Sequence, residues 1–181
     1  MSTLKVDTIL KRTGTGTITV GQSGDTISVP TGATLSVSGS TSGLITPAFA
    51  VRKTNGDQSY SQNTATKVTF NTELLDTNSA FASDKFTVPS GEAGTYLFNV
   101  SIRMGAIAAD SGMNIFLYKN GSEYTRILSY VTDESENPIF GAVQAMDLSV
   151  ADYVEVYGQT NGGAGNFKDN HCQFTGFKLG A

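Results

Sequence analysis

The sequence predicts an all-β protein, and three observations support this fold class. Apolar and polar residues alternate with a period of two along most of the chain, which is typical of strands that bury one face. Only 15% of the residues are charged, compared with roughly 25% in globular proteins generally, and 20 of the 181 residues are glycine. Finally, Asn120-Gly121 stands between two alternating segments, a pattern that favours a two-residue type I′ hairpin.

From residue 47 onward, the sequence predicts a compact sandwich or jelly roll. Candidate strands follow one another about every 8 to 12 residues and are separated by turn signals. They are Phe49–Lys53, Thr66–Phe70, Lys85–Val88, Gly94–Arg103, Asn114–Lys119, Ser122–Leu128, Ile139–Leu148, Tyr153–Gln159 and Cys172–Leu179. The glycine-rich segment 161–166 lacks the Gly-Lys-Ser/Thr of a phosphate-binding loop and is expected to be a wide connection between strands.

Residues 15–46 predict a different structure, a stalk built from three short repeats. Thr17–Val20, Thr26–Val29 and Thr34–Val37 each alternate a hydroxyl residue with an apolar one. The stalk core would consist of the apolar residues Ile18, Val20, Ile27, Val29, Leu35 and Val37. Because a single copy leaves its strand edges unpaired, we expect an interwoven, three-stranded β stalk made by several chains. A flexible Gly/Ser/Thr-rich linker is the alternative.

Charge and composition exclude several classes of partner. The formal net charge is -4 and the pI is about 4.9, so the chain has no electrostatic basis for binding a nucleic-acid backbone. No apolar run is long enough for a signal peptide or a membrane span, and a single cysteine excludes an intramolecular disulfide. We therefore expect no nucleic acid, no membrane insertion and synthesis in a cytosol.

The sequence contains no recognisable catalytic or cofactor machinery. His171 and Cys172 are neighbours in a predicted strand, so they point to opposite faces and cannot easily act on one target. Cys172 is instead expected in the core beside Phe174. The chain lacks the four Cys or His ligands of a zinc site and the Gly-x-Ser-x-Gly motif of many serine hydrolases. We expect no enzyme activity, no metal and no cofactor.

Two polar segments are candidates for surface contacts. One is the loop 55–63, whose amides, hydroxyls and single tyrosine suit saccharides, or simply water; the other is the acidic cluster 133–138, which could face a partner, face solvent or hold calcium. The candidate contact residues are Asn55, Asp57, Gln58, Tyr60, Asp133, Glu134 and Glu136.

Aromatic residues at particular spacings resemble the signature of the C1q family, whose heads share a jelly roll with TNF-like proteins. Phe70, Asp76, Phe81 and Phe86 precede the strand Gly94–Val100, which contains a Gly-x-Tyr-x-Phe pattern. The closing segment Cys172–Leu179 has the Phe-x-Gly-Phe motif of the family's last strand. The resemblance covers residues 48–181. It departs from the family in the gaps around Phe86 and at Val100, where an aromatic residue is usual.

This resemblance implies a ten-stranded jelly roll that assembles as a compact homotrimer, with both termini at its base. Some members of the family bind calcium near the trimer axis. The segment Met1–Ile9 also resembles the opening of short fibre proteins from tailed bacteriophages. That second resemblance implies three parts: residues 1–14 anchor the chain to other virion proteins, 15–46 form the stalk and 47–181 form the head.

Four hypotheses for function follow from these patterns. The first is a non-enzymatic trimeric tail fibre or receptor-binding protein, synthesised in the cytoplasm of a host bacterium and carried on the phage particle. Its head would attach to a saccharide or protein of the host surface. The alternative is a purely structural capsid decoration fibre or tail connector without a receptor. A secreted C1q-like adhesion module and an enzyme acting on carbohydrate are the third and fourth.

Overall fold

The structure is a computed structural model that describes residues 9, 18–22, 24–34, 47–132 and 137–180. The chain divides into two compact units, Met1–Thr41 and Ser42–Ala181. All regular secondary structure of the described residues lies in the second unit. No helix that could cross a membrane occurs in the part of the chain that the structure describes.

The described residues of the first unit form turns and no strand. One turn is closed by the Asp25 amide, which donates to the carbonyl oxygen of Gln22 over 3.0 Å. Four of the predicted stalk-core residues are exposed in the single chain: Ile18, Val20, Ile27 and Val29. The other two, Leu35 and Val37, and nearly all of the predicted anchor lie outside the described residues. Packing of these repeats against other copies of the chain stays a prediction.

The described part of the second unit contains thirteen strands and no helix. They are β1 (Ala48–Arg52), β2 (Gln58–Tyr60), β3 (Thr66–Lys67), β4 (Thr72–Asp76), β5 (Phe81–Ala82), β6 (Lys85–Thr87), β7 (Gly94–Gly105), β8 (Ser111–Lys119), β9 (Ser122–Thr132), β10 (Ile139–Leu148), β11 (Tyr153–Thr160), β12 (Gly165–Phe167) and β13 (Gln173–Gly180).

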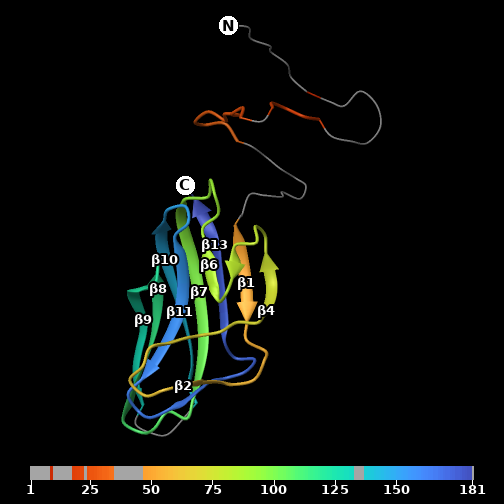
Figure 1. Ribbon diagram of the computed structural model, residues 1–181. Coiled ribbons are helices and arrows are strands. Elements are labelled where there is room, and N and C mark those ends of the chain that lie inside the picture. Colours follow the sequence, from red (N-terminus) through yellow and green to blue (C-terminus); the bar gives the residue numbers. More distant parts are fainter. Residues whose placement is uncertain (1–8, 10–17, 23, 35–46, 133–136, 181) are drawn as a thin grey trace. The chain divides into compact units, whose positions relative to one another are not determined.

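These strands form two antiparallel sheets that pack against each other (Figure 1). Ten of them make two five-stranded sheets: a first sheet in the order β4-β1-β13-β7-β10 and a second in the order β5-β6-β11-β8-β9. The short strands β2 and β12 extend the first sheet, and β3 pairs with β11 of the second. This confirms the all-β fold class, with thirteen described strands where the family resemblance implied ten.

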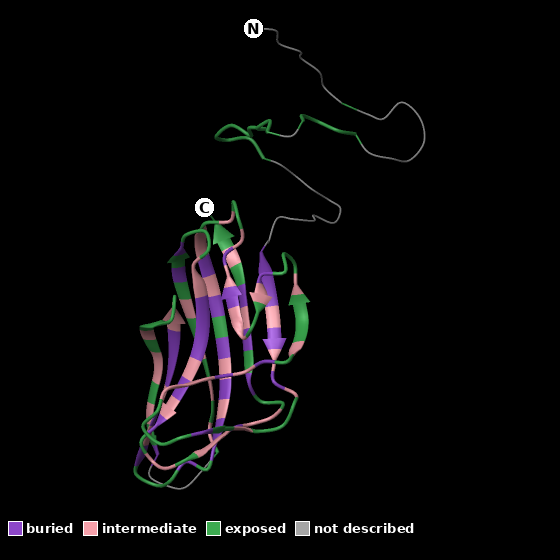
Figure 2. Cartoon of the chain, in the orientation of Figure 1, coloured by how far each residue is buried: buried purple, intermediate pink, exposed green. Residues whose placement is uncertain are grey.

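The core lies between the two sheets and follows from the period-two alternation. In β7, Tyr96, Phe98 and Val100 are at most 2% exposed, and they alternate with outward-facing residues, as the striped colouring shows (Figure 2). The ring of Phe49 in β1 stacks on that of Phe86 in β6, with centroids 4.9 Å apart. This aromatic contact joins the two sheets, because each ring comes from a different one.

The hairpin between β8 and β9 has the predicted geometry. Asn120 and Gly121 have φ values of 53° and 78°, and Lys119 pairs directly with Ser122. Positive φ at both central residues is what a type I′ turn requires. The Asn120 side chain also accepts a hydrogen bond of 2.9 Å from the amide of Tyr153, which ties the turn to β11.

The chain enters and leaves the second unit at the same end. Ala48 pairs with Phe177, and the Lys178 amide donates to the carbonyl oxygen of Pro47 over 3.1 Å. Loops around β2 form the opposite end (Figure 1). The expected proximity of the two ends of the head is therefore confirmed.

Four short strands were missed by the sequence analysis, and one was overestimated. β2, β4, β5 and β12 are not among the predicted strands, whereas the predicted strand Thr66–Phe70 is reduced to Thr66–Lys67. The segment 161–166, predicted as a connection, contributes its end to β12. A Cβ atom at Gly165 would lie 2.2 Å from the carbonyl oxygen of Gly105. Glycine is needed there because the β12 backbone approaches β7 so closely.

Two glycines of β13 provide a matched test of core packing. A Cβ at Gly176 would lie 2.6 Å from the ring of Phe98 and 2.7 Å from that of Phe49, whereas nothing lies within 4 Å of one at Gly180. We expect Gly176→Ala to lower the free energy of unfolding by about 1–3 kcal/mol through overpacking. Gly180→Ala should change it by less than ~0.5 kcal/mol. Urea unfolding followed by circular dichroism measures both, and equal losses would contradict this packing.

Candidate functional site

The loop before β2 contains two of the predicted contact residues, Asn55 and Asp57. The Oδ1 atom of Asn55 accepts a 2.7 Å hydrogen bond from the buried Lys53. Asp57 accepts from Lys168 Nζ at 2.6 Å and from the Asp169 amide at 2.9 Å. The hydrogen bond from Lys168 is the largest cause that lowers the pKa of Asp57. Both side chains remain exposed, so this loop is an ordered polar surface that a partner can reach.

The structure corrects the prediction for Tyr60. Its side chain is 3% exposed, and its hydroxyl donates to the carbonyl oxygen of Gly105 over 2.7 Å. The ring lies 5.1 Å from that of Phe167, and burial raises the pKa of the phenol to about 12. Tyr60 therefore anchors β2 to the core and offers no stacking surface to a ligand.

Gln58 is also less available than predicted, because its amide binds the neighbouring backbone. Nε2 donates to the carbonyl oxygen of Lys67 over 2.7 Å, and Oε1 accepts from the Thr69 amide at 2.8 Å. The other candidates, Asp133, Glu134 and Glu136, lie outside the described residues, and their role as contacts stays a prediction.

Cys172, which was considered for catalysis because it follows His171, is a core residue in the structure. Cys172 is fully buried, as predicted. Burial raises the pKa of its thiol to about 11, which keeps it protonated and unreactive at neutral pH. Among the described residues, no three or more His, Cys, Asp or Glu side chains come together in a group that could hold a metal ion.

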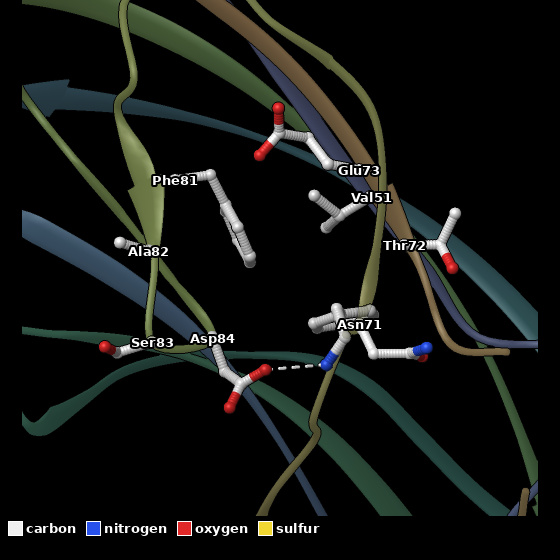
Figure 3. Close-up of a pocket in the computed structure, with 9 residues that line it drawn as sticks. Val51, Asn71, Thr72, Glu73, Phe81, Ala82, Ser83 and Asp84 are labelled. Atoms are coloured by element: carbon white, nitrogen blue, oxygen red, sulfur yellow. Dashed lines mark hydrogen bonds between the residues drawn. The ribbon is translucent and has the colours of Figure 1, made fainter. Parts of the chain in front are cut away.

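A cavity of about 260 Å³ opens between β4 and β5, where one edge of the first sheet lies near one edge of the second (Figure 3). Its lining residues are Val51, Phe70, Asn71, Thr72, Glu73, Phe81, Ala82, Ser83 and Asp84. The side chain of Phe81 points into this cavity (Figure 3). We call it the lateral pocket; it combines an apolar wall with a polar rim.

Two carboxylates belong to the rim of the lateral pocket. The Oδ1 atom of Asp84 accepts a 2.7 Å hydrogen bond from the Phe70 amide, which fixes this carboxylate at the mouth (Figure 3). Ser83 and Asp84 have φ values of 53° and 58°, and they form the two-residue turn between β5 and β6. The side chain of Glu73 has no hydrogen-bond or ion-pair partner in the part of the chain that the structure describes.

The lateral pocket was not predicted from the sequence. Residues 71–73 and 81–84 come from two segments that meet only because the sandwich brings the edges of its sheets together. Phe70 and Phe81 belong to the aromatic pattern described above, and both line the pocket. Their position on either side of residues 71–80 is the only local feature of the sequence that could have indicated it.

The outward face of the first sheet carries several exposed apolar side chains. Antiparallel register sets Leu75 beside Ala50 and Ala50 beside Thr175. It then sets Thr175 beside Asn99 and Asn99 beside Val143, so one row of side chains crosses the sheet. The exposed large apolar residues of this surface are Leu75, Ile139, Val143, Phe177 and Leu179. A hollow of about 300 Å³ lies within it, near Leu75 and Phe177. We call this surface the sheet face.

A second apolar surface runs along the opposite side of the sandwich from the lateral pocket. Here the edge strands β9 and β10 lie next to each other, and the rings of Tyr130 and Phe140 are 4.9 Å apart. Val131 of β9 is 67% exposed. We call this surface the open side, because no strand among the described residues pairs with the outer edge of either β9 or β10.

The fold is similar to that of solved C1q and TNF-type structures, at low sequence identity. No protein-family model matches the chain, and no curated protein gives a match. Among solved structures, the globular domain of zebrafish complement 1qA aligns over 74% of this chain and 98% of its own length, with 20% identity and a TM-score of 0.52. Eiger TNF from S. frugiperda aligns over 74% and 92%, with 14% identity and a TM-score of 0.51.

Murine APRIL at pH 5.0 is similar at 13% identity and a TM-score of 0.53, over 73% of this chain and 98% of its own. These similarities show that the second unit has the C1q and TNF jelly roll.

The hydroxyl of Tyr60 can be tested against an exposed tyrosine. Tyr60→Phe removes the hydrogen bond to Gly105, and we expect it to cost about 1 kcal/mol of unfolding free energy. Tyr124→Phe alters a side chain that is 50% exposed and should cost less than ~0.5 kcal/mol. Thermal or urea unfolding of the two variants gives the comparison. A Tyr60→Phe variant as stable as Tyr124→Phe would show that the anchor contributes nothing.

Proposed function

We propose that this chain is a non-enzymatic fibre protein of a tailed bacteriophage particle. It assembles as a homotrimer and attaches the particle to the host surface through residues 47–181. The observation that carries the proposal is the presence of two different exposed apolar surfaces on one jelly-roll unit, the sheet face and the open side. Large exposed apolar patches on a soluble domain mark interaction sites.

Two different surfaces on each chain favour a ring over a two-fold dimer. A two-fold dimer uses the same patch on both subunits, whereas two unlike patches give a head-to-tail contact that closes into a ring when the rotation permits. In a ring, the open side of one chain covers the sheet face of the next. Trimers are typical of the C1q and TNF jelly roll, and three chains are the number we propose here.

The N-terminal part of the chain supports the fibre assignment. Its repeats expose Ile18, Val20 and Ile27 in the single chain, and three chains wound together would bury them. The segment Met1–Ile9 resembles the opening of phage fibre proteins and would bind another virion protein. Three heads on each fibre, and several fibres on each particle, turn weak single contacts into strong attachment.

Assembly through the sheet face can be tested with one charged substitution. We expect Val143→Asp, made in a fragment of residues 47–181 that lacks the stalk, to dissociate the trimer at micromolar concentration, because an unpaired charge is costly to bury. Ser61→Asp adds the same charge at an exposed turn and should leave the trimer intact. Size-exclusion chromatography separates the two results. Identical elution of both variants as trimers would contradict a contact at Val143.

The fibre function itself is tested on phage particles. Serum raised against residues 47–181 should label the tail of purified particles in the electron microscope and block their adsorption to host cells. Label spread over the capsid, with no effect of the serum on adsorption, would contradict attachment and indicate a decoration role. Absence of label from every particle would contradict the phage assignment, and release of reducing ends from host polysaccharide would contradict the non-enzymatic one.

A further inference from the structure

We propose that the lateral pocket binds one uncharged hexose unit of a cell-surface polysaccharide. This inference deepens the proposed function, and its biological meaning rests on it, because it names the chemistry of the receptor. It depends on four features of the pocket: its size, its aromatic wall, its hydrogen-bond acceptors and the sign of its charge.

The size of the pocket limits the ligand to about one sugar ring. Pockets for drug-sized molecules usually measure about 300–1,000 Å³, and this one has about 260 Å³. A space of that size and openness excludes a folded peptide or a base-paired nucleic acid. It suits a single ring at the end, or along the side, of a longer chain.

The wall of the pocket suits the apolar face of a sugar. Phe81 is only half-buried, although it stacks on Phe49 with ring centroids 5.2 Å apart. Phe70 lies edge-on to it at 6.3 Å. These contacts hold the Phe81 ring in place while part of it faces the pocket (Figure 3). Covering this ring with the C–H groups of a hexose removes apolar surface of both from water.

The rim of the pocket suits hydroxyl groups. Ionised carboxylates only accept hydrogen bonds, and a hydroxyl that donates to one forms a charge-assisted bond. The unpartnered Glu73 carboxylate in β4 and the second oxygen of Asp84 in the turn between β5 and β6 are such acceptors. Acceptors on both sides of one ring would fix its orientation, as hexose recognition requires.

The charge of the pocket selects against acidic sugars. None of the nine lining residues is basic, and two of them are carboxylates. The nearby Lys67, which donates to the carbonyl oxygen of Ser83 over 2.7 Å, is already ion-paired with Glu155 at 2.8 Å. A uronic or sialic acid would place a third negative charge beside them, which costs affinity through like-charge repulsion. The absence of a cation in the lining is therefore the feature that distinguishes an uncharged hexose from an anionic one.

The pocket also stays open in the proposed trimer. It lies at the β4 and β5 edges of the sandwich, whereas the open side lies at the β9 and β10 edges. The outward row of the sheet face includes Leu75, but Glu73 is paired with the inward-facing Val51. The contacts of the proposed ring therefore lie on the sheet face and the open side, and the pocket opens on neither of them.

Nuclear magnetic resonance of the full-length chain with labelled valine methyl groups tests this inference. Val51 lines the pocket, and the exposed Val150, which is not part of the lining, serves as an internal reference. The probes are methyl glucoside, methyl galactoside and methyl mannoside, up to about 100 mM, because a single sugar contact commonly has a millimolar Kd. We expect at least one of them to shift the Val51 methyl signals and to leave those of Val150 in place.

Two variants and one further probe make the result specific. Glu73→Gln should weaken binding about tenfold through loss of a charge-assisted hydrogen bond. Glu123→Gln, which removes the same charge from exposed β9, should leave binding unchanged. The uronic acid counterpart of the binding hexoside should bind at least about tenfold more weakly. Any of three results would overturn the inference: no shift with any hexoside, equal binding by both variants, or equal binding of the acid.

Competition for adsorption separates this inference from the proposed function. Purified full-length chain should block phage adsorption, and Glu73→Gln should block it less well. Equal blocking by the two proteins would leave attachment standing and refute the pocket as its receptor site. If the chain shifts the Val51 signals with a hexoside but does not block adsorption, the pocket is confirmed as a hexose site and the attachment function is refuted.

Discussion

The packing of aromatic rings between the two sheets is the contact on which the rest of this structure depends. Phe49 touches Phe86 across the sandwich and Phe174 within its own sheet, with centroids 4.9 and 4.8 Å apart. This cluster fills the centre and holds the sheets together, but it reaches neither lateral side completely. The lateral pocket lies on one side, between β4 and β5, and the apolar edges of β9 and β10 are exposed on the other.

The exposed apolar side chains of this unit favour assembly with other copies of the chain. This unit leaves apolar side chains in water on two surfaces, with Val131 on the open side and Val143 on the sheet face. Burying a side chain of this kind contributes about 1.5–3 kcal/mol, so a neighbouring copy placed over the open side gains stability. The same reasoning applies to the N-terminal repeats, whose apolar residues also lack partners in one chain. Both parts of the molecule are consistent with assembly from several copies.

Much of the fold could be predicted because apolar and polar residues alternate strictly along its central strands. Tyr96, Phe98 and Val100 mark β7 as a strand with one buried face, and Asn120-Gly121 predicts its turn from two residues alone. The short strands could not be predicted, since three residues such as Gln58–Tyr60 are too few to show a period. Tyr60 was assigned to the surface for this reason. The lateral pocket was beyond prediction, because Glu73 and Asp84 become neighbours of one cavity only through the packing of two sheets.

The central claim is that the chain assembles into a closed trimer, and the mass of the full-length protein in solution tests it most directly. Native mass spectrometry at micromolar concentration should give a complex of three chains, each of 19.0 kDa. A single chain under the same conditions would contradict the roles assigned to the sheet face, the open side and the N-terminal repeats together.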